Sequence, residues 1–107
     1  KYPVLVSMDP GKQENIVLDR ERMTVGKQKE QVDIFLQDPS VSRIHASLEK
    51  SGEDWYLRDR GSTNGTFLDG LRLEEGEKKK LLDGAEISFS GRRFYFHSDS
   101  TGSTVQN

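Results

Sequence analysis

The segment Ala85-Glu86-Ile87-Ser88-Phe89-Ser90-Gly91-Arg92-Arg93-Phe94-Tyr95-Phe96 alternates apolar and polar side chains on either side of a Ser-Gly pair. Alternation with a period of two is typical of strands that bury one face, and Ser-Gly is a frequent turn signal. The segment therefore predicts two short strands joined by a turn.

Short apolar segments of the same kind continue through the rest of the chain. They lie at residues 2–6, 15–18, 23–25, 34–36, 46–48, 55–57 and 66–68. Turn signals separate them, among them Asp9-Pro10-Gly11, Asp38-Pro39-Ser40 and Ser51-Gly52, and Asp69-Gly70 fits a type I′ hairpin turn. No helical period persists long enough for a substantial helix. Roughly ten short strands at this spacing predict an all-β sandwich or barrel, with its binding loops gathered at an end.

The composition limits the class of protein. A length of 107 residues favours one domain with one core. The net charge of −2 provides no global attraction to nucleic acid or anionic membranes, and no apolar run is long enough to span a membrane. The chain has no cysteine, which excludes disulfides and thiolate chemistry and favours the cytoplasm. We therefore expect no nucleic-acid partner, no membrane insertion and a monomeric isolated domain.

The two ends of the chain differ in composition from its middle. Residues 98–107 are mainly small and polar, with Val105 as the one apolar side chain, which predicts a flexible tail or linker after a domain over residues 1–97. The chain begins at Lys1, without a Met or an apolar leader, so we expect a longer parent protein.

Two polar segments carry donors that suit an anion. Ser42 and Arg43 place a hydroxyl beside a guanidinium, and both groups bind phosphate oxygens well. Residues 61–66 (Gly-Ser-Thr-Asn-Gly-Thr) are rich in donors, and Asn64 can bond both the C=O and the N–H of a peptide backbone. Each segment alone is more simply interpreted as a surface turn. His45 is interpreted as a brace that bonds neighbouring backbone.

Other chemistries fit the sequence less well. Ser42, His45 and Asp59 could suggest a hydrolase, but the first two lie along one loop without a nucleophile elbow. Two histidines and no cysteine argue against a zinc site, and we expect no cofactor and no enzymatic activity. The lysines within residues 74–80 are mixed with glutamates, so we interpret this segment as a solvated loop and not as a nucleic-acid patch.

In combination, the polar segments resemble the signature of the forkhead-associated (FHA) family. That signature is Gly-Arg, then Ser-x-x-His, then Asn-Gly, and here Gly26-Lys27, Ser42-Arg43-Ile44-His45 and Asn64-Gly65 stand in the same order. Residues 82–87 (Leu-Asp-Gly-Ala-Glu-Ile) are similar to the family's late Leu-x-Asp-Gly-Asp-x-Ile segment. The resemblance covers nearly the whole chain. It implies an antiparallel β-sandwich of about eleven short strands with its binding loops at one end.

The resemblance also implies a function and a set of site residues. FHA domains are phosphothreonine-dependent adaptor modules of signalling proteins, and their partners are modified by a Ser/Thr kinase. The residues implied to touch a phosphopeptide are Lys27, Ser42, Arg43, Thr63 and Asn64, the last through the peptide main chain. The residues implied to shape the loops are Gly26, His45 and Gly65.

Lys27 departs from the family's arginine. Lysine keeps the positive charge but loses the planar fork that grips phosphate through two parallel hydrogen bonds. A phosphate-independent protein-interaction module that uses the same loops is therefore the alternative hypothesis.

Overall fold

The structure is a computed structural model that describes residues 1–98. The described residues form eleven short strands and one turn of 3-10 helix, η1 (Lys29–Gln31). The strands are β1 (Val4–Ser7), β2 (Ile16–Val17), β3 (Arg22–Gly26), β4 (Ile34–Phe35), β5 (Ala46–Ser51), β6 (Asp54–Asp59), β7 (Thr66–Leu68), β8 (Leu71–Arg72), β9 (Lys78–Lys80), β10 (Glu86–Phe89) and β11 (Arg92–His97). The prediction of an all-β fold is confirmed. From residue 99 onward, the predicted flexible tail lies outside the described residues.

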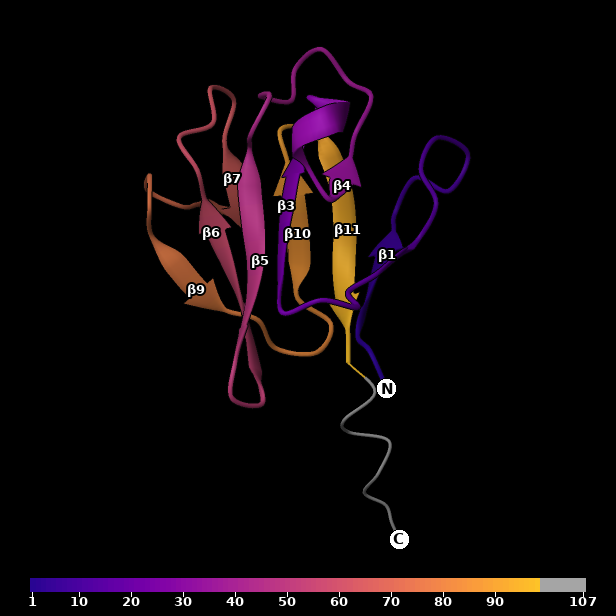
Figure 1. The fold of residues 1–107 in the computed structure, drawn as a ribbon, viewed down its shortest axis with the longest axis vertical. Helices are drawn as coiled ribbons and strands as arrows, with labels where there is room; N and C mark the ends of the chain where they lie inside the picture. Colours follow the sequence, from indigo (N-terminus) through magenta and orange to yellow (C-terminus); the bar gives the residue numbers. More distant parts are fainter. Residues whose placement is uncertain (99–107) are drawn as a thin grey trace, which may run out of the picture.

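The strands make two sheets that face each other (Figure 1). One sheet has six strands in the order β2-β1-β11-β10-β7-β8, and the other has five in the order β4-β3-β5-β6-β9. Every pairing is antiparallel except that between β3 and β4. These two strands are parallel because the chain leaves β3 through η1 and returns to the same edge, instead of reversing in a hairpin. The predicted antiparallel sandwich is therefore confirmed with one exception at an edge.

The core lies between the sheets and is built from alternate residues of each strand. The β10–β11 hairpin contributes Ile87, Phe89, Phe94 and Phe96, each no more than 3% exposed. The rings of Phe89 and Phe94 meet edge to face, with their centroids 5.9 Å apart. This burial is what the alternation of the hairpin sequence predicts, because a period of two directs one set of side chains inward.

The turn between β7 and β8 has the type I′ conformation that Asp69-Gly70 predicts. Asp69 and Gly70 have φ of 50° and 84°, as a type I′ turn requires.

The interpretation of residues 74–80 as a solvated loop is wrong for Lys78–Lys80, which pair with Tyr56–Arg58 of β6. All three lysines of this edge strand are exposed, so no alternation of apolar residues marks it.

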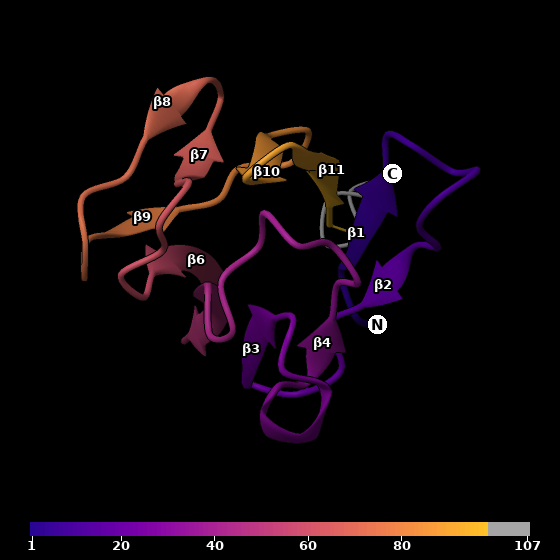
Figure 2. The same cartoon turned by 90° about the horizontal axis from the view of Figure 1, so that it is seen from above.

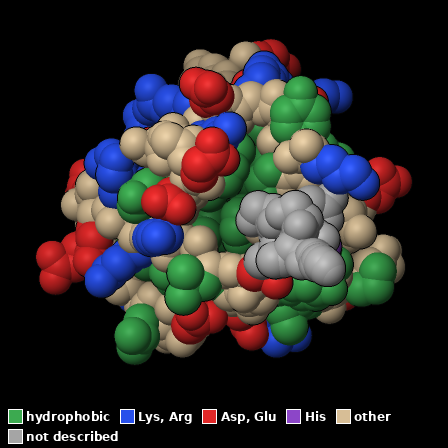
Figure 3. All heavy atoms as spheres, turned by 90° about the horizontal axis from the view of Figure 1, so that it is seen from below, with side chains coloured by type: hydrophobic (Ala, Val, Ile, Leu, Met, Phe, Trp, Pro, Cys, Tyr) green, Lys and Arg blue, Asp and Glu red, His purple; other side chains and the backbone are tan. Residues whose placement is uncertain are grey.

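The loops that carry the predicted site gather at one end of the sandwich. Seen from above this end, the β4–β5 connection crosses the space between the sheets and the β6–β7 loop lies beside it (Figure 2). The opposite end instead shows apolar side chains at its centre (Figure 3). Among the described residues, no helix is long and apolar enough to cross a membrane.

Candidate functional site

Gly26 ends β3 and lets this strand approach the β4–β5 loop closely. A Cβ at this position would lie 1.8 Å from the carbonyl oxygen of Arg43 and 3.1 Å from that of Ser42. The same two oxygens accept backbone hydrogen bonds from Gln28 at 3.3 Å and Lys27 at 3.1 Å. Only glycine fits here, because any side chain would separate the two segments.

His45 connects the β4–β5 loop with the β6–β7 loop inside the core. Its imidazole is fully buried. The backbone N–H of Ser42 donates to Nδ1 at 3.0 Å, and Nε2 lies 2.8 Å from the carbonyl oxygen of Gly65. Because Nδ1 accepts, Nε2 carries the proton and donates to Gly65. Both ring nitrogens are thus bonded to backbone.

Burial lowers the pKa of His45, although the hydrogen bond to Gly65 and the charge of Asp59 act in the opposite direction. The neutral imidazole is therefore the stable form near pH 7. A neutral ring is also what the two backbone contacts require, because a protonated Nδ1 could not accept the hydrogen bond from Ser42.

Two more hydrogen bonds join the loops at their tips. The Ser42 hydroxyl accepts the backbone N–H of Thr63 at 3.0 Å, and Asn64 Nδ2 donates to the Ser40 carbonyl oxygen at 2.8 Å. Ser40 is held in turn by Asp38 at 2.7 Å and by the Ser90 hydroxyl at 2.8 Å. The Ser42 hydroxyl and the Asn64 amide therefore already fix the distance between the loops in the free protein.

A buried carboxylate, which sequence reasoning did not assign to this role, holds the β6–β7 loop from below. Asp59 accepts hydrogen bonds from the hydroxyls of Ser62 at 2.6 Å and Thr66 at 2.7 Å, and from the backbone N–H of Gly61 at 2.9 Å. Burial alone would raise its pKa, but these bonds outweigh burial and the pKa is lowered. Asp59 therefore stays ionised, and its charge is satisfied inside the loop.

Gly65 and Arg72 complete the β6–β7 loop. Gly65 has a φ of 100°, and a Cβ there would lie 2.7 Å from the Phe67 ring. Arg72 Nη2 donates to the Thr63 carbonyl oxygen at 3.2 Å. Arg72 is a further cation beside this loop that sequence reasoning missed, because it lies on β8, outside the motif.

The predicted cations lie on the same end. Lys27 is exposed, and its Nζ donates to the Pro39 carbonyl oxygen at 3.2 Å, which holds it against the β4–β5 loop. Arg43 is exposed, and within residues 1–98 its guanidinium has no hydrogen bond or ion pair. The Thr63 hydroxyl, also exposed, has no partner in this part of the chain either. Residues from three separate segments thus present two cations and unpaired donors at one surface.

The geometry does not support hydrolysis by Ser42, His45 and Asp59. His45 contacts the backbone of Ser42 and not its hydroxyl, and Asp59 is occupied by Ser62, Thr66 and Gly61. Within residues 1–98 there is no cluster of three metal-ligating side chains. What the arrangement can do is bind an anion through donors that are already in position.

Comparisons with known proteins agree with this fold. The model of the FHA domain family matches residues 23–90. An oxoglutarate dehydrogenase inhibitor of Corynebacterium jeikeium is 32% identical over 97 residues, which cover 91% of this chain and 65% of that protein. The glycogen accumulation regulator GarA of Mycolicibacterium smegmatis is 31% identical over 106 residues, or 95% of this chain and 65% of GarA. The chain thus spans about 65% of the length of these two regulators.

Solved structures show the same sandwich. Mycobacterium tuberculosis EmbR in complex with a low-affinity phosphopeptide is similar with a TM-score of 0.81 at 25% identity, over 90% of this chain and 24% of that one. The FHA domain of CT664 from Chlamydia trachomatis has a TM-score of 0.79 at 24% identity, over 92% of this chain and 98% of that one. Because the family match covers more than half of the sequence, this chain belongs to the FHA-domain family.

Proposed function

We propose that this chain is a phosphothreonine-dependent, non-catalytic binding module of a larger signalling protein. The observation that carries the proposal is the loop end, where the backbone N–H groups of Lys27 and Thr63 both donate to Ser42 and the side chains of Lys27, Arg43 and Thr63 are exposed. Their ligand would be a protein segment that a Ser/Thr kinase has modified. The lack of cysteine supports action in the cytoplasm.

The chemistry of phosphothreonine matches these donors. The phosphate carries about −1.5 to −2 charges and three acceptor oxygens at neutral pH. Hydrogen bonds to charged groups are worth about 1.5–3 kcal/mol each before ordering costs. Since the chain carries a net charge of −2, attraction must come from the local cluster. The loops are fixed before binding, by His45 and Ser42, so little ordering cost remains.

An extended ligand would also find room on either side of the loops. A groove of about 650 Å³ is lined by Asp9, Lys12, Gln13, Phe35, Gln37, Asp38, Pro39, Gly91 and Arg92. A second groove of about 450 Å³ is lined by Asp59, Gly61, Ser62, Arg72, Leu73, Glu74 and Glu75. Asn64, in the β6–β7 loop, donates its Nδ2 to the β4–β5 loop at Ser40, and its amide oxygen would accept from the ligand main chain.

The proposal predicts that binding depends on the phosphate and on the threonine methyl. A degenerate phosphothreonine library would select a sequence, which is then titrated by calorimetry as phosphothreonine, phosphoserine and unmodified peptides. We expect the phosphoserine peptide to bind about 10–200-fold more weakly, the usual effect of one methyl in an apolar recess. The unmodified peptide should bind at least about 100-fold more weakly, because the charge-assisted bonds are gone. Ser42→Ala and Arg43→Ala should each weaken binding of the phosphopeptide. Arg93→Ala, on the other sheet, should leave this binding unchanged. Equal binding of the unmodified peptide would favour the phosphate-independent alternative.

Lys27 provides a second prediction. If its Nζ turns from Pro39 to the phosphate, Lys27→Ala should weaken phosphopeptide binding about tenfold and reduce its salt dependence. Lys27→Arg should strengthen binding, since a guanidinium offers two parallel donors. Fluorescence anisotropy at two salt concentrations measures both effects. Lys50→Ala, on the hairpin at the far end, is the matched control. Unchanged binding by Lys27→Ala at both salt concentrations would leave Arg43 as the main phosphate cation.

A further inference from the structure

The outer face of the five-stranded sheet carries two rows of polar side chains, away from the loops. In the first row Arg22 pairs with Glu49, Glu49 with Tyr56, and Tyr56 with Lys80, across β3, β5, β6 and β9. The second row contains Thr24, Ser47, Arg58 and Lys78 in the same strands. We call these eight residues the basic sheet face. Each row spans about 14 Å, because neighbouring strands are about 4.8 Å apart.

The basic sheet face has a charge opposite to that of the chain. Its four cations outnumber its one carboxylate, Glu49, by three, whereas the whole chain has a net charge of −2. Only one cation is neutralised within the rows, since Arg58 holds Glu49 through Nε at 2.9 Å and Nη2 at 3.2 Å. Two more carboxylates adjoin the rows: Asp54, on the same side of β6 as Tyr56, lies 3.6 Å from Lys80, and Asp33, paired with Arg20, accepts a hydrogen bond from the Thr24 hydroxyl. Exposed ion pairs of this kind contribute little, so the cations of the rows remain available. Among the described residues, no carboxylate forms an ion pair with Arg22 or Lys78.

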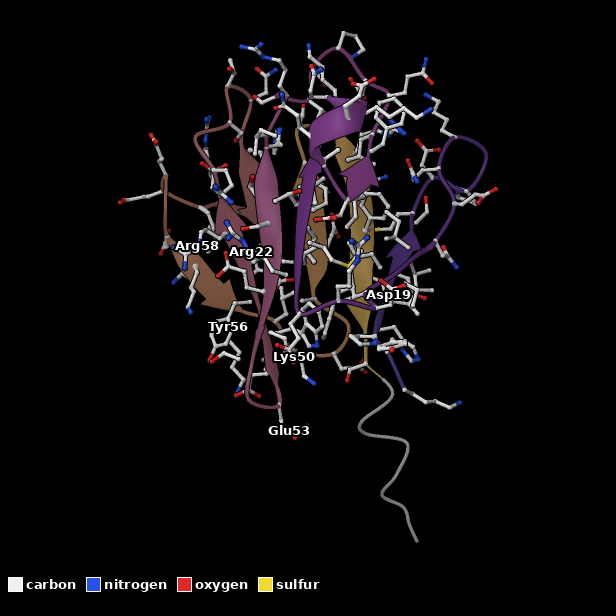
Figure 4. The ribbon with its side chains drawn as sticks, viewed as in Figure 1. Asp19, Arg22, Lys50, Glu53, Tyr56 and Arg58 are labelled. Atoms are coloured by element: carbon white, nitrogen blue, oxygen red, sulfur yellow. The ribbon has the colours of Figure 1, made fainter. Side chains whose placement is uncertain are left out.

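Tyr56 lies among the cations of the basic sheet face. The Lys78 Nζ lies 4.8 Å from the centroid of its ring. Figure 4 shows Arg22, Tyr56 and Arg58 together on the sheet. Tyrosine and arginine dominate the energetic centres of protein interfaces, because they offer large, rigid contact area and directional donors.

Protection of a sheet edge explains only part of this arrangement. Lysines on an edge strand discourage pairing with other chains, and Lys78 and Lys80 on β9 fulfil that role. Arg22 begins β3 at a point that β4 does not reach, since β4 pairs only with Val25 and Gly26, whereas Tyr56 lies on the inner strand β6. Edge protection can account for the cations, but the half-buried tyrosine among them calls for a different explanation.

From this arrangement we infer that the basic sheet face is a second docking surface, which binds an acidic segment of a protein partner. A short run of carboxylates would reach Arg22, Lys78 and Lys80 while lying across Tyr56. Beyond the rows, Asp19 lies at the side and Lys50 and Glu53 lie at the lower end (Figure 4), so charges of both signs follow one another there and a long polyanion such as nucleic acid would gain little beyond the rows. This inference does not depend on phosphothreonine binding at the loops.

The experiment is a ¹⁵N NMR titration of the whole chain with a blocked hexaglutamate peptide. Six extended residues span about 20 Å, which is enough to cross a row. We expect saturable shifts of the amides of Arg22, Glu49, Tyr56 and Lys80, and weaker binding at higher salt. Hexaglutamine should cause none of these shifts, and Ser42→Ala should leave them unchanged.

Charge reversal tests whether the face itself is responsible. Lys78→Glu with Lys80→Glu should weaken hexaglutamate binding about tenfold, because two attractions become repulsions. Arg22→Glu, on another strand, should act in the same direction if the double variant fails to fold. Lys12→Glu with Arg93→Glu changes the net charge equally but lies elsewhere, and should have little effect. Shifts confined to the loop end, or equal weakening by both double variants, would overturn the inference. A short DNA duplex that shifts the same amides at lower concentration would assign the face to nucleic acid instead.

Discussion

Replacing Gly26 by alanine should unfold the loop end and lower the melting temperature by more than about 12 °C. The new Cβ would lie 1.8 Å from the Arg43 carbonyl oxygen and 2.7 Å from its carbon, so backbone must move. The bonds from Lys27 and Gln28 to this loop would then break. Overpacking costs about 1–3 kcal/mol, and lost buried hydrogen bonds add to it. In a domain of this size, each kcal/mol lost from the free energy of unfolding lowers the melting temperature by about 4–8 °C.

Thermal unfolding followed by circular dichroism measures this effect, and Gly11→Ala is its matched control. A Cβ on Gly11 would meet no atom within 4 Å, so this variant should remain within about 0.5 kcal/mol of the parent. Gly26→Ala should also lose phosphopeptide binding, because Ser42 and Arg43 move with their carbonyls. A Gly26→Ala protein as stable as the parent would mean that the close approach does not exist in solution.

Most of the fold could be predicted from the sequence because its strands bury one face. The alternation of Ile87 and Phe89, and then of Phe94 and Phe96, records which side chains face the core. Lys78–Lys80 shows no such alternation, because this edge strand has no apolar face. Its pairing with β6 is set by tertiary contacts. The parallel pairing of β4 was likewise beyond prediction, because it depends on the path of the chain through η1.

The candidate site was predictable in its motif residues but not in the contacts between them. The order of Gly26, Ser42 and Asn64 identifies the loops, yet the contacts of Asn64 with Ser40 and of Arg72 with Thr63 join residues that no local pattern relates. The sequence suggested Asp59 only as a catalytic residue. Asp59 followed by Gly61 and Ser62 is the spacing at which a carboxylate accepts N–H groups two and three residues ahead, and that signal could have revealed its structural role.

Asp59→Ala should cost about 3–5 kcal/mol, because the hydroxyls of Ser62 and Thr66 and the N–H groups of Gly61 and Ser62 would lose their acceptor. That is a large share of the roughly 5–15 kcal/mol that holds a domain together. Urea unfolding would measure the loss. Asp59→Asn is the matched control, since its oxygen can accept the two N–H groups while its amide donates to the hydroxyls, and it should cost about half as much.

Urea unfolding of the parent and of Asp59→Asn at several pH values separates the effect of the Asp59 charge from the effect of its shape. The folded-state pKa of Asp59 lies below its ordinary value of 3.8, so its ionised form stabilises the fold above that pH. The stabilisation is lost as the pH falls through the folded-state pKa, because the protonated carboxyl then resembles the amide of Asp59→Asn. The free energy of unfolding of the parent should therefore exceed that of Asp59→Asn by a constant amount near neutral pH. This difference should shrink below pH 3.8. A difference that stays the same at low pH would show that the β6–β7 loop needs the shape of this side chain and not its charge.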